Sequence, residues 1–166
     1  MAMHRTVAQV LSLTVFLIAG GSYVNADEPG DINTFPKILT ADPLKAKPGD
    51  DELHKLRKSL YNERQSLALG EYKAYIGGHQ YTDSLLGAAR RLMKSGLELS
   101  DKRQDKVDFL EKMQGFAKKV ETLTASRPNP KGNTQQELDK IRSREFALEV
   151  DIELLKLKKE GGSKKD

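Results

Sequence analysis

The side chains best spaced for metal chemistry are His79 and Asp83, which stand four residues apart. Such a pair can supply two ligands to a metal ion, whereas a zinc site uses three or four. The chain contains no cysteine, and no third ligand lies near the pair in sequence. We therefore expect His79 to be a solvated turn residue, and we predict neither a metal nor another cofactor.

A second candidate for chemistry is the carboxylate series Glu145, Glu149 and Glu153, which shares one face of a predicted helix. Like charges spaced in this way can raise a pKa and support acid–base catalysis. The same series is typical of a solvated helix face, and lysines follow it. The sequence has no Glu-x-x-His element, nucleophile elbow, phosphate loop or catalytic triad spacing. We expect no catalytic residues and no enzymatic activity.

Basic residues form three small clusters, namely Arg90-Arg91, Lys118-Lys119 and Lys156-Lys158-Lys159. Cationic side chains beside a helix can contact phosphate, either in lipid headgroups or in nucleic acid. Acidic residues are interleaved with these clusters, which predicts a surface of mixed charge and no nucleic-acid partner. Peripheral membrane contact stays open.

Residues 1–26 have the layout of a secretory signal peptide. A short segment with one basic residue precedes an apolar run from Val7 to Gly20, and Val24 and Ala26 precede a predicted cut. The apolar run is shorter than the ~20 residues that span a bilayer, although an uncut anchor is the alternative. Cleavage predicts an exported protein of the periplasm or cell envelope without a transmembrane span.

Residues 27–50 contain four of the six prolines and predict an irregular leader. A helix should then begin after an N-cap at Asp50, run to about Tyr75 and end at Gly77-Gly78. Its leucines recur every seven residues with one beside them, as the series Leu53, Leu60 and Leu67 with Leu56. A narrow apolar seam of this kind packs along another helix.

Thr82 is the predicted N-cap of a second helix, which carries Leu85 and Leu92 seven residues apart. Small residues near this stripe, Gly96 among them, would let another helix come close. The first two helices form either an antiparallel hairpin or one kinked rod, and the sequence leaves both open.

Two more helices complete an all-α prediction. The third should start near Ser100 and end before the segment 126–133, which contains Gly132. The fourth should start at Thr134, whose side chain forms a capping box with Glu137. Residues 161–166 predict a flexible tail. The apolar positions of these helices are Val107, Leu110, Met113, Ala117, Val120 and Leu123, then Leu138, Ile141, Phe146, Leu148, Val150, Ile152, Leu154 and Leu155.

The helical domain, residues 51–160, has two similar halves. The stretch "MKSGLEL" at 93–99 lines up with "LEVDIEL" at 148–154. A helix, a glycine-containing turn and a threonine cap precede each stretch. The halves, 51–99 and 100–160, therefore predict a duplicated helix–turn–helix that forms long hairpins or an elongated bundle.

The stretch 72–99, "YKAYIGGHQYTDSLLGAARRLMKSGLEL", resembles the helical segments of TolC-like bacterial outer-membrane efflux proteins. The matching positions are Tyr75, Gly78, Thr82, Leu85, Leu86, Ala88, Leu92, Leu97 and Leu99. The resemblance extends over about 51–158 and implies helical hairpins and an envelope location. It does not imply a pore, because the sequence lacks the alternating transmembrane strands of that family.

Two functional hypotheses follow. The first is an exported, non-enzymatic helical protein that associates with a protein partner or with itself, in an efflux or secretion assembly if the resemblance holds. Its partner-helix seam would comprise Leu53, Leu56, Leu60, Leu67, Leu85, Leu92, Leu148, Ile152 and Leu155, of which some must fill the protein's own core. The second is a small ligand- or metal-binding four-helix bundle with His79, Asp83, Glu145 and Glu149 as candidate ligands.

Overall fold

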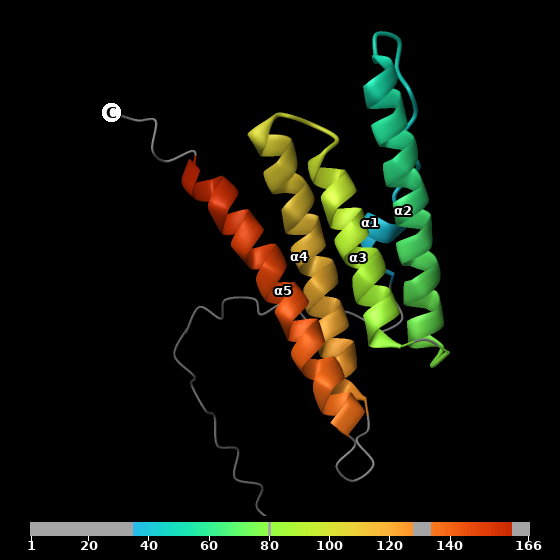
Figure 1. Ribbon diagram of the computed structural model, residues 1–166, viewed down its shortest axis with the longest axis vertical. Helices are drawn as coiled ribbons and strands as arrows, with labels where there is room; N and C mark the ends of the chain where they lie inside the picture. Colours follow the sequence, from blue (N-terminus) through green and yellow to red (C-terminus); the bar gives the residue numbers. More distant parts are fainter. Residues whose placement is uncertain (1–34, 80, 128–133, 161–166) are drawn as a thin grey trace, which may run out of the picture. The chain divides into compact units, whose positions relative to one another are not determined.

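The computed structural model describes residues 35–79, 81–127 and 134–160. Within these ranges the regular elements are all helices (Figure 1). They are α1 (Lys37–Thr40), α2 (Glu52–Ile76), α3 (Thr82–Leu97), α4 (Arg103–Ser126) and α5 (Thr134–Glu160). The predicted all-α fold with four long helices is confirmed. The predicted signal peptide, Gly132 and the predicted tail lie outside the described residues.

The long helices pack as two antiparallel hairpins, α2 with α3 and α4 with α5 (Figure 1). Gly77 ends α2, and Gly78 has a left-handed backbone with φ of 77°. This turn lets the amide of His79 donate to the carbonyl of Ala74 at 2.9 Å. The first two helices therefore form a hairpin rather than a kinked rod. Each predicted half corresponds to one hairpin, and the duplication itself stays a prediction.

The core lies mainly on α3 and α4, whose apolar faces are buried as predicted. The buried residues of these two helices include Leu85, Leu86, Ala88, Ala89, Leu92, Val107, Leu110, Met113, Phe116, Ala117 and Val120. Burial of each large side chain contributes about 1.5–3 kcal/mol to the free energy of unfolding. The contacts of α3 with α4 and α5 join the two hairpins.

A row of aromatic rings crosses the core from the leader to the last helix. Phe35, Tyr72, Phe116 and Phe146 meet edge to face, with centroid distances of 5.9, 5.9 and 6.5 Å between successive rings. This arrangement places the positive edge of one ring against the negative face of the next. The row connects the leader, α2, α4 and α5.

The leader differs from the prediction because part of it is folded into the core. Its short helix α1 buries Ile38 and Leu39, which are 4% and 2% exposed. The side-chain amide of Gln65 donates to the carbonyls of Ile38 and Ala41 at 2.8 and 3.2 Å. The only signal in the sequence was one apolar dipeptide between prolines, too short to predict a helix.

The cap of α2 lies one residue later than predicted. Asp51, not Asp50, is the N-cap, and its carboxylate accepts a hydrogen bond from the amide of His54 at 2.6 Å. Asp50 instead binds the Lys58 ammonium at 2.6 Å and the Lys47 amide at 2.7 Å. These two hydrogen bonds, the former the stronger cause, lower the pKa of Asp50.

The predicted cap of α3 is wrong. Tyr81 is the N-cap, its side chain does not cap the helix by a hydrogen bond, and Thr82 is the first helical residue. The Thr82 side chain is 1% exposed, because it faces the core rather than the free amides of the first turn. The capping box of Thr134 and Glu137 stays a prediction, since the residues before Thr134 lie outside the described residues.

Gly96 is required by a close contact between α3 and α4. A Cβ atom built at this position would overlap the ring of Phe109. The prediction that small residues on this stripe let a helix come close is therefore confirmed at Gly96. Gly115 offers a matched control, because a Cβ there meets no heavy atom within 4 Å.

We expect Gly96→Ala to lower the free energy of unfolding by about 1–3 kcal/mol, as overpacking does. Gly115→Ala should raise it by about 0.5–1 kcal/mol, because alanine favours the helix. Urea denaturation followed by circular dichroism measures both. Equal effects of the two substitutions would contradict the close contact.

Tyr75 holds the closed end of the first hairpin against α4. Its hydroxyl lies 2.7 Å from Oγ1 of Thr124, which donates to the Val120 carbonyl at 2.8 Å. A threonine hydroxyl has one proton, so Tyr75 is the donor in the first hydrogen bond. The Arg127 guanidinium lies 3.8 Å from the centre of the Tyr75 ring and donates to the Tyr75 carbonyl.

Tyr72 is buried differently. Its hydroxyl is inaccessible and has no hydrogen-bond partner among the described residues. Burial raises the pKa of Tyr72 to about 12, above the value of about 10 expected for an unfolded chain. The unfolded state therefore releases this proton first, and the contribution of Tyr72 to stability is lost as the pH rises from about 10 towards 12.

We expect Tyr72→Phe to raise the free energy of unfolding by about 1 kcal/mol at pH 8, because it removes an unpaired buried hydroxyl. It should also reduce the loss of stability between about pH 10 and 12. Tyr75→Phe should instead lower stability by about 1 kcal/mol, since that hydroxyl is bonded. Urea denaturation at pH 8 and at about pH 11 measures the stability of each variant. Destabilisation by Tyr72→Phe at pH 8 would contradict the prediction.

Candidate functional site

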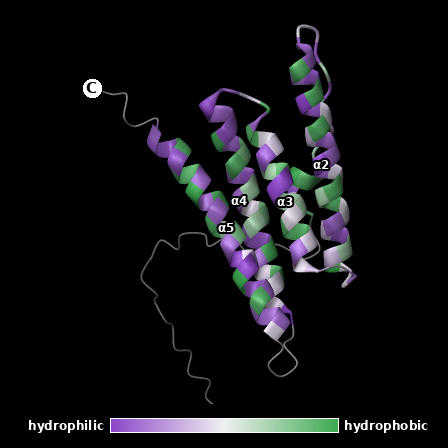
Figure 2. Ribbon diagram, in the orientation of Figure 1, coloured by the Kyte–Doolittle hydropathy of each residue, from purple (hydrophilic) through white to green (hydrophobic). Residues whose placement is uncertain are grey.

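The candidate functional surface consists of apolar side chains that remain exposed on the two outer helices. The α2 seam is Leu53, Leu56, Leu60 and Leu67, each 42–59% exposed. The α5 seam is Leu138, Ile141, Leu148, Ile152 and Leu155, each 40–63% exposed. Figure 2 shows apolar and polar residues alternating along both helices. Contiguous apolar side chains with this exposure mark interaction sites more often than isolated ones do.

Both seams face outward because each helix packs into the core through its opposite side. The buried side of α2 carries Lys58, Tyr61, Gln65, Ala68, Tyr72 and Tyr75, and that of α5 carries Gln136, Ser143, Phe146, Ala147, Val150 and Leu154. Each helix thus has two sides with large apolar residues. On these two helices tyrosine and phenylalanine are the largest core side chains, and most leucines and isoleucines are left outside.

Two members of the predicted partner-helix seam do not belong to this surface. Leu85 and Leu92 are fully buried, because α3 packs between the other helices and faces the core with its leucines. They fill the protein's own core, as some of the predicted residues had to. The other seven predicted residues are exposed on α2 and α5.

Two of the four candidate ligands of the alternative hypothesis, Glu149 and Asp83, are already paired. The guanidinium of Arg90 binds both oxygens of Glu149, at 2.8 and 2.9 Å, and this hydrogen bonding raises the pKa of Arg90. Arg142 binds Asp83 at 2.6 Å. Both pairs join α3 to α5 at a half-exposed position, where an ion pair contributes at most about 1 kcal/mol.

A metal site is not formed by the described residues, which contain no group of three or more histidine, aspartate or glutamate side chains placed to hold an ion. His79 is exposed in the turn after α2. The ion pairs of Asp83 and Glu149 neutralise two of its candidate co-ligands. The geometry therefore gives the metal-binding hypothesis no support.

Three residues of the basic clusters, Arg90, Lys156 and Lys158, form ion pairs as well. Lys158 binds Glu111 at 2.9 Å, and Lys156 binds Glu153 at 2.6 Å. Together with the Arg90–Glu149 pair, these contacts give a surface on which both signs of charge lie side by side. Such a surface favours neither nucleic acid nor an anionic membrane.

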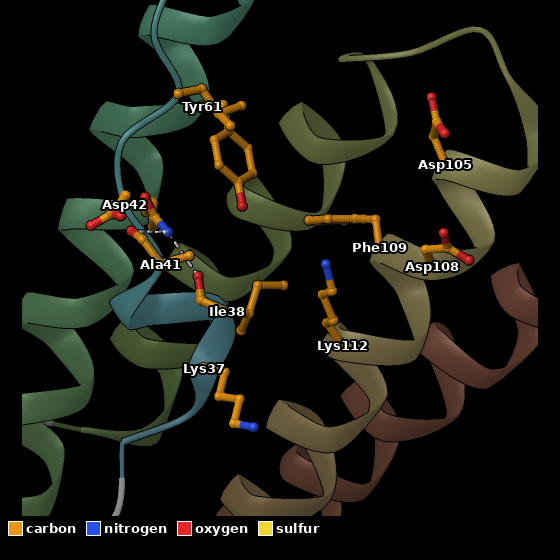
Figure 3. Close-up of a pocket in the computed structure, with 11 residues that line it drawn as sticks. Lys37, Ile38, Ala41, Asp42, Tyr61, Asp105, Asp108, Phe109 and Lys112 are labelled. Atoms are coloured by element: carbon orange, nitrogen blue, oxygen red, sulfur yellow. Dashed lines mark hydrogen bonds between the residues drawn. The ribbon is translucent and has the colours of Figure 1, made fainter.

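An open pocket of about 570 Å³ lies between the leader, α2 and α4 (Figure 3). Its apolar part includes Tyr61 and Phe109, whose rings meet edge to face at 6.2 Å. The charged lining residues are Lys37, Asp42, Asp105, Asp108 and Lys112. Gln65, the uncharged polar residue of the lining, already binds the carbonyls of the leader. Charges of both signs surround the apolar part, so the pocket favours no particular class of ligand.

Comparison with known proteins finds no matching family model, no similar curated protein and no similar solved structure. The resemblance to TolC-like proteins is therefore untested. Among the described residues, no helix has the length and apolar composition needed to cross a bilayer.

Substituting lysine at one exposed and one buried leucine tests the placement of the seams. We expect Leu60→Lys to change the free energy of unfolding by no more than about 0.5 kcal/mol, because the side chain is on the surface. Leu92→Lys should lower it by more than about 4 kcal/mol, since it buries an unpaired charge. Thermal unfolding by circular dichroism measures both, and comparable losses would contradict an exposed α2 seam.

Proposed function

We propose that this protein is an exported, non-enzymatic helical protein of a bacterial cell envelope that binds protein partners through the α2 and α5 seams. The observation that carries the proposal is that large apolar side chains at heptad spacing stay exposed although the core is filled. Covering these side chains with the apolar face of another helix would remove them from water, which is the main driving force for helix association.

The geometry of the seams supports a helical partner. The α2 seam uses spacings of three, four and seven residues, and the α5 seam uses three, seven, four and three. Side chains at these spacings form one narrow stripe, into which the residues of a second helix insert as knobs into holes. The partner is therefore a helix with apolar residues at the same repeat.

Export is proposed from the signal-peptide pattern of residues 1–26. A role in an efflux or secretion assembly is proposed from the TolC resemblance alone, which is an analogy of sequence pattern. The mixed surface charge supports a protein partner rather than nucleic acid.

Photo-crosslinking in the native cells tests the proposed function. A photoreactive amino acid replaces Leu56 in the α2 seam, Leu148 in the α5 seam, or Lys118 as an exposed control on α4. We expect defined crosslinked products from the seam positions and not from Lys118, because only the seams lie against a partner. Mass spectrometry then identifies the attached chain as an envelope component or as a second copy.

The same preparation tests export. The N-terminus of the protein recovered from the envelope fraction should be Asp27. Recovery of a chain that begins at Met1 would contradict cleavage, and equal labelling from Leu56, Leu148 and Lys118 would contradict partner binding through the seams.

A further inference from the structure

We propose that the α5 seam binds the α5 seam of a second copy of this chain, with the two helices parallel and in register. The proposal rests on the proposed function, since it names the occupant of one of the two seams. It follows from the pattern of charges that flank the α5 seam.

The α5 seam has a definite heptad register. Leu138, Glu145 and Ile152 occupy the a positions, and Ile141, Leu148 and Leu155 occupy the d positions. Ser143 and Val150 then fall at f, directly opposite the seam, and both are buried against the rest of the protein. The a and d residues are therefore directed away from the chain's own core. In a coiled coil, the e and g residues would flank the contact.

The flanking charges alternate in sign in a way that matches a second copy. The g positions carry Glu137, Arg144, Asp151 and, near the end of the helix, Lys158, and the e positions carry Arg142, Glu149 and Lys156. In a parallel, in-register pair each g residue meets the e residue five positions later on the other helix. These contacts would be Glu137 with Arg142, Arg144 with Glu149 and Asp151 with Lys156. All three are attractive, and the two-fold axis repeats each of them. In the first two, Arg142, Arg144 and Glu149 would add the second copy to the partners that they already bind within the chain.

Other arrangements of two α5 helices place like charges together. A shift of one heptad sets Glu137 against Glu149 and Arg144 against Lys156. An antiparallel pair matches e with e and g with g. The alignment that pairs Arg144 with Asp151 then sets Glu149 against its own copy, and the alignment that pairs Arg142 with Glu149 sets Arg144 against its own copy. Since like charges disfavour an alignment, the sign pattern selects the parallel, in-register pair.

The α2 seam lacks this pattern. Its e positions carry Arg57, Arg64 and Glu71, but its g positions after Glu52 are Ser59, Ser66 and Lys73, and the residue five positions after Lys73 is Gly78. A parallel pair of α2 helices would therefore gain only the contact of Glu52 with Arg57. Charge complementarity assigns the second copy to α5 and not to α2.

Glu145 interrupts the apolar series at an a position, where the two copies of this residue would face each other. Arg144 of the second copy, at the preceding g position, would lie beside it. A polar residue at one a position fixes the register of a coiled coil and weakens it. The pair is therefore a reversible dimer rather than an obligate one.

Reciprocal charge substitution tests the pairing. Asp151 and Lys156 suit this test because their contacts within the chain are with the Gln114 amide and with Glu153 on the same helix. Neither takes part in the ion pairs between α3 and α5 described above. The full chain as produced by cells is compared with the D151K variant, the K156D variant and an equimolar mixture of the two, by sedimentation at increasing protein concentration.

The wild-type chain should form a reversible dimer. Each variant alone should dimerise about tenfold more weakly, a loss of about 1.4 kcal/mol, because two flanking pairs change from attraction to repulsion. The mixture should regain the wild-type affinity as a heterodimer, since it restores both attractive pairs. Mixing cannot change contacts within a chain, so this recovery separates pairing from folding. Circular dichroism should show wild-type helicity for both variants.

Two control variants test whether the dimer forms through the α5 seam. Leu60→Lys in the α2 seam should leave the dimer unchanged, whereas Glu145→Leu should tighten it at least tenfold by completing the apolar series. If the D151K and K156D variants dimerise as tightly as the wild-type chain, pairing through α5 is overturned. Association of the protein through another surface would still stand. A wild-type chain that stays monomeric would overturn self-pairing, and crosslinking from Leu148 would still decide the proposed function independently.

Discussion

The row of edge-to-face rings is the contact on which the rest of the structure depends. The chain has only ten aromatic residues, five phenylalanines and five tyrosines. Four of them form this row, which holds the leader, α2, α4 and α5 in one core. Because Tyr72 and Phe146 must enter the row, α2 and α5 are rotated so that their aromatic sides face inward. That rotation directs the leucines of both helices to the surface.

The exposed seams are thus a consequence of how the core is filled and not of a lack of apolar residues. The α3 and α4 helices have one apolar side each and bury it. The α2 and α5 helices have two, and packing against a single layer of neighbours can bury only one. The ion pairs of Arg90 with Glu149 and Arg142 with Asp83 then lie at the border between core and seam on α5. They fix the side of α5 that faces α3.

Helix content and most helix ends could be predicted from the sequence. Apolar residues recur at helical spacing, and glycine and proline interrupt this pattern where the helices end. The buried faces of α3 and α4 could also be predicted, since only one side of each is apolar. The seven-residue leucine series of α2 did not reveal which side faces the core. Heptad spacing reports that a stripe can pack against a helix but not whether that helix belongs to the same chain. Thr82 was misassigned because a threonine before an apolar run fits both a cap and a core position.

The packing of the leader into the core could not be predicted, for a different reason. Ile38 and Leu39 form too short a pattern to carry any period, and they are held by Gln65 and by the aromatic row, which are distant in sequence. For the candidate site, the residue types of the seams were evident, but the exclusion of Leu85 and Leu92 required knowledge of the helix packing.

The two seams lie on helices that share no contact among the described residues. A protein with this layout can hold one helix without hindering access to the other. If two copies join through α5, the assembly presents two α2 seams at a fixed separation. A partner that is itself repeated would then meet the second seam at a local concentration in the millimolar range, and its avidity would exceed the affinity of either seam alone by orders of magnitude.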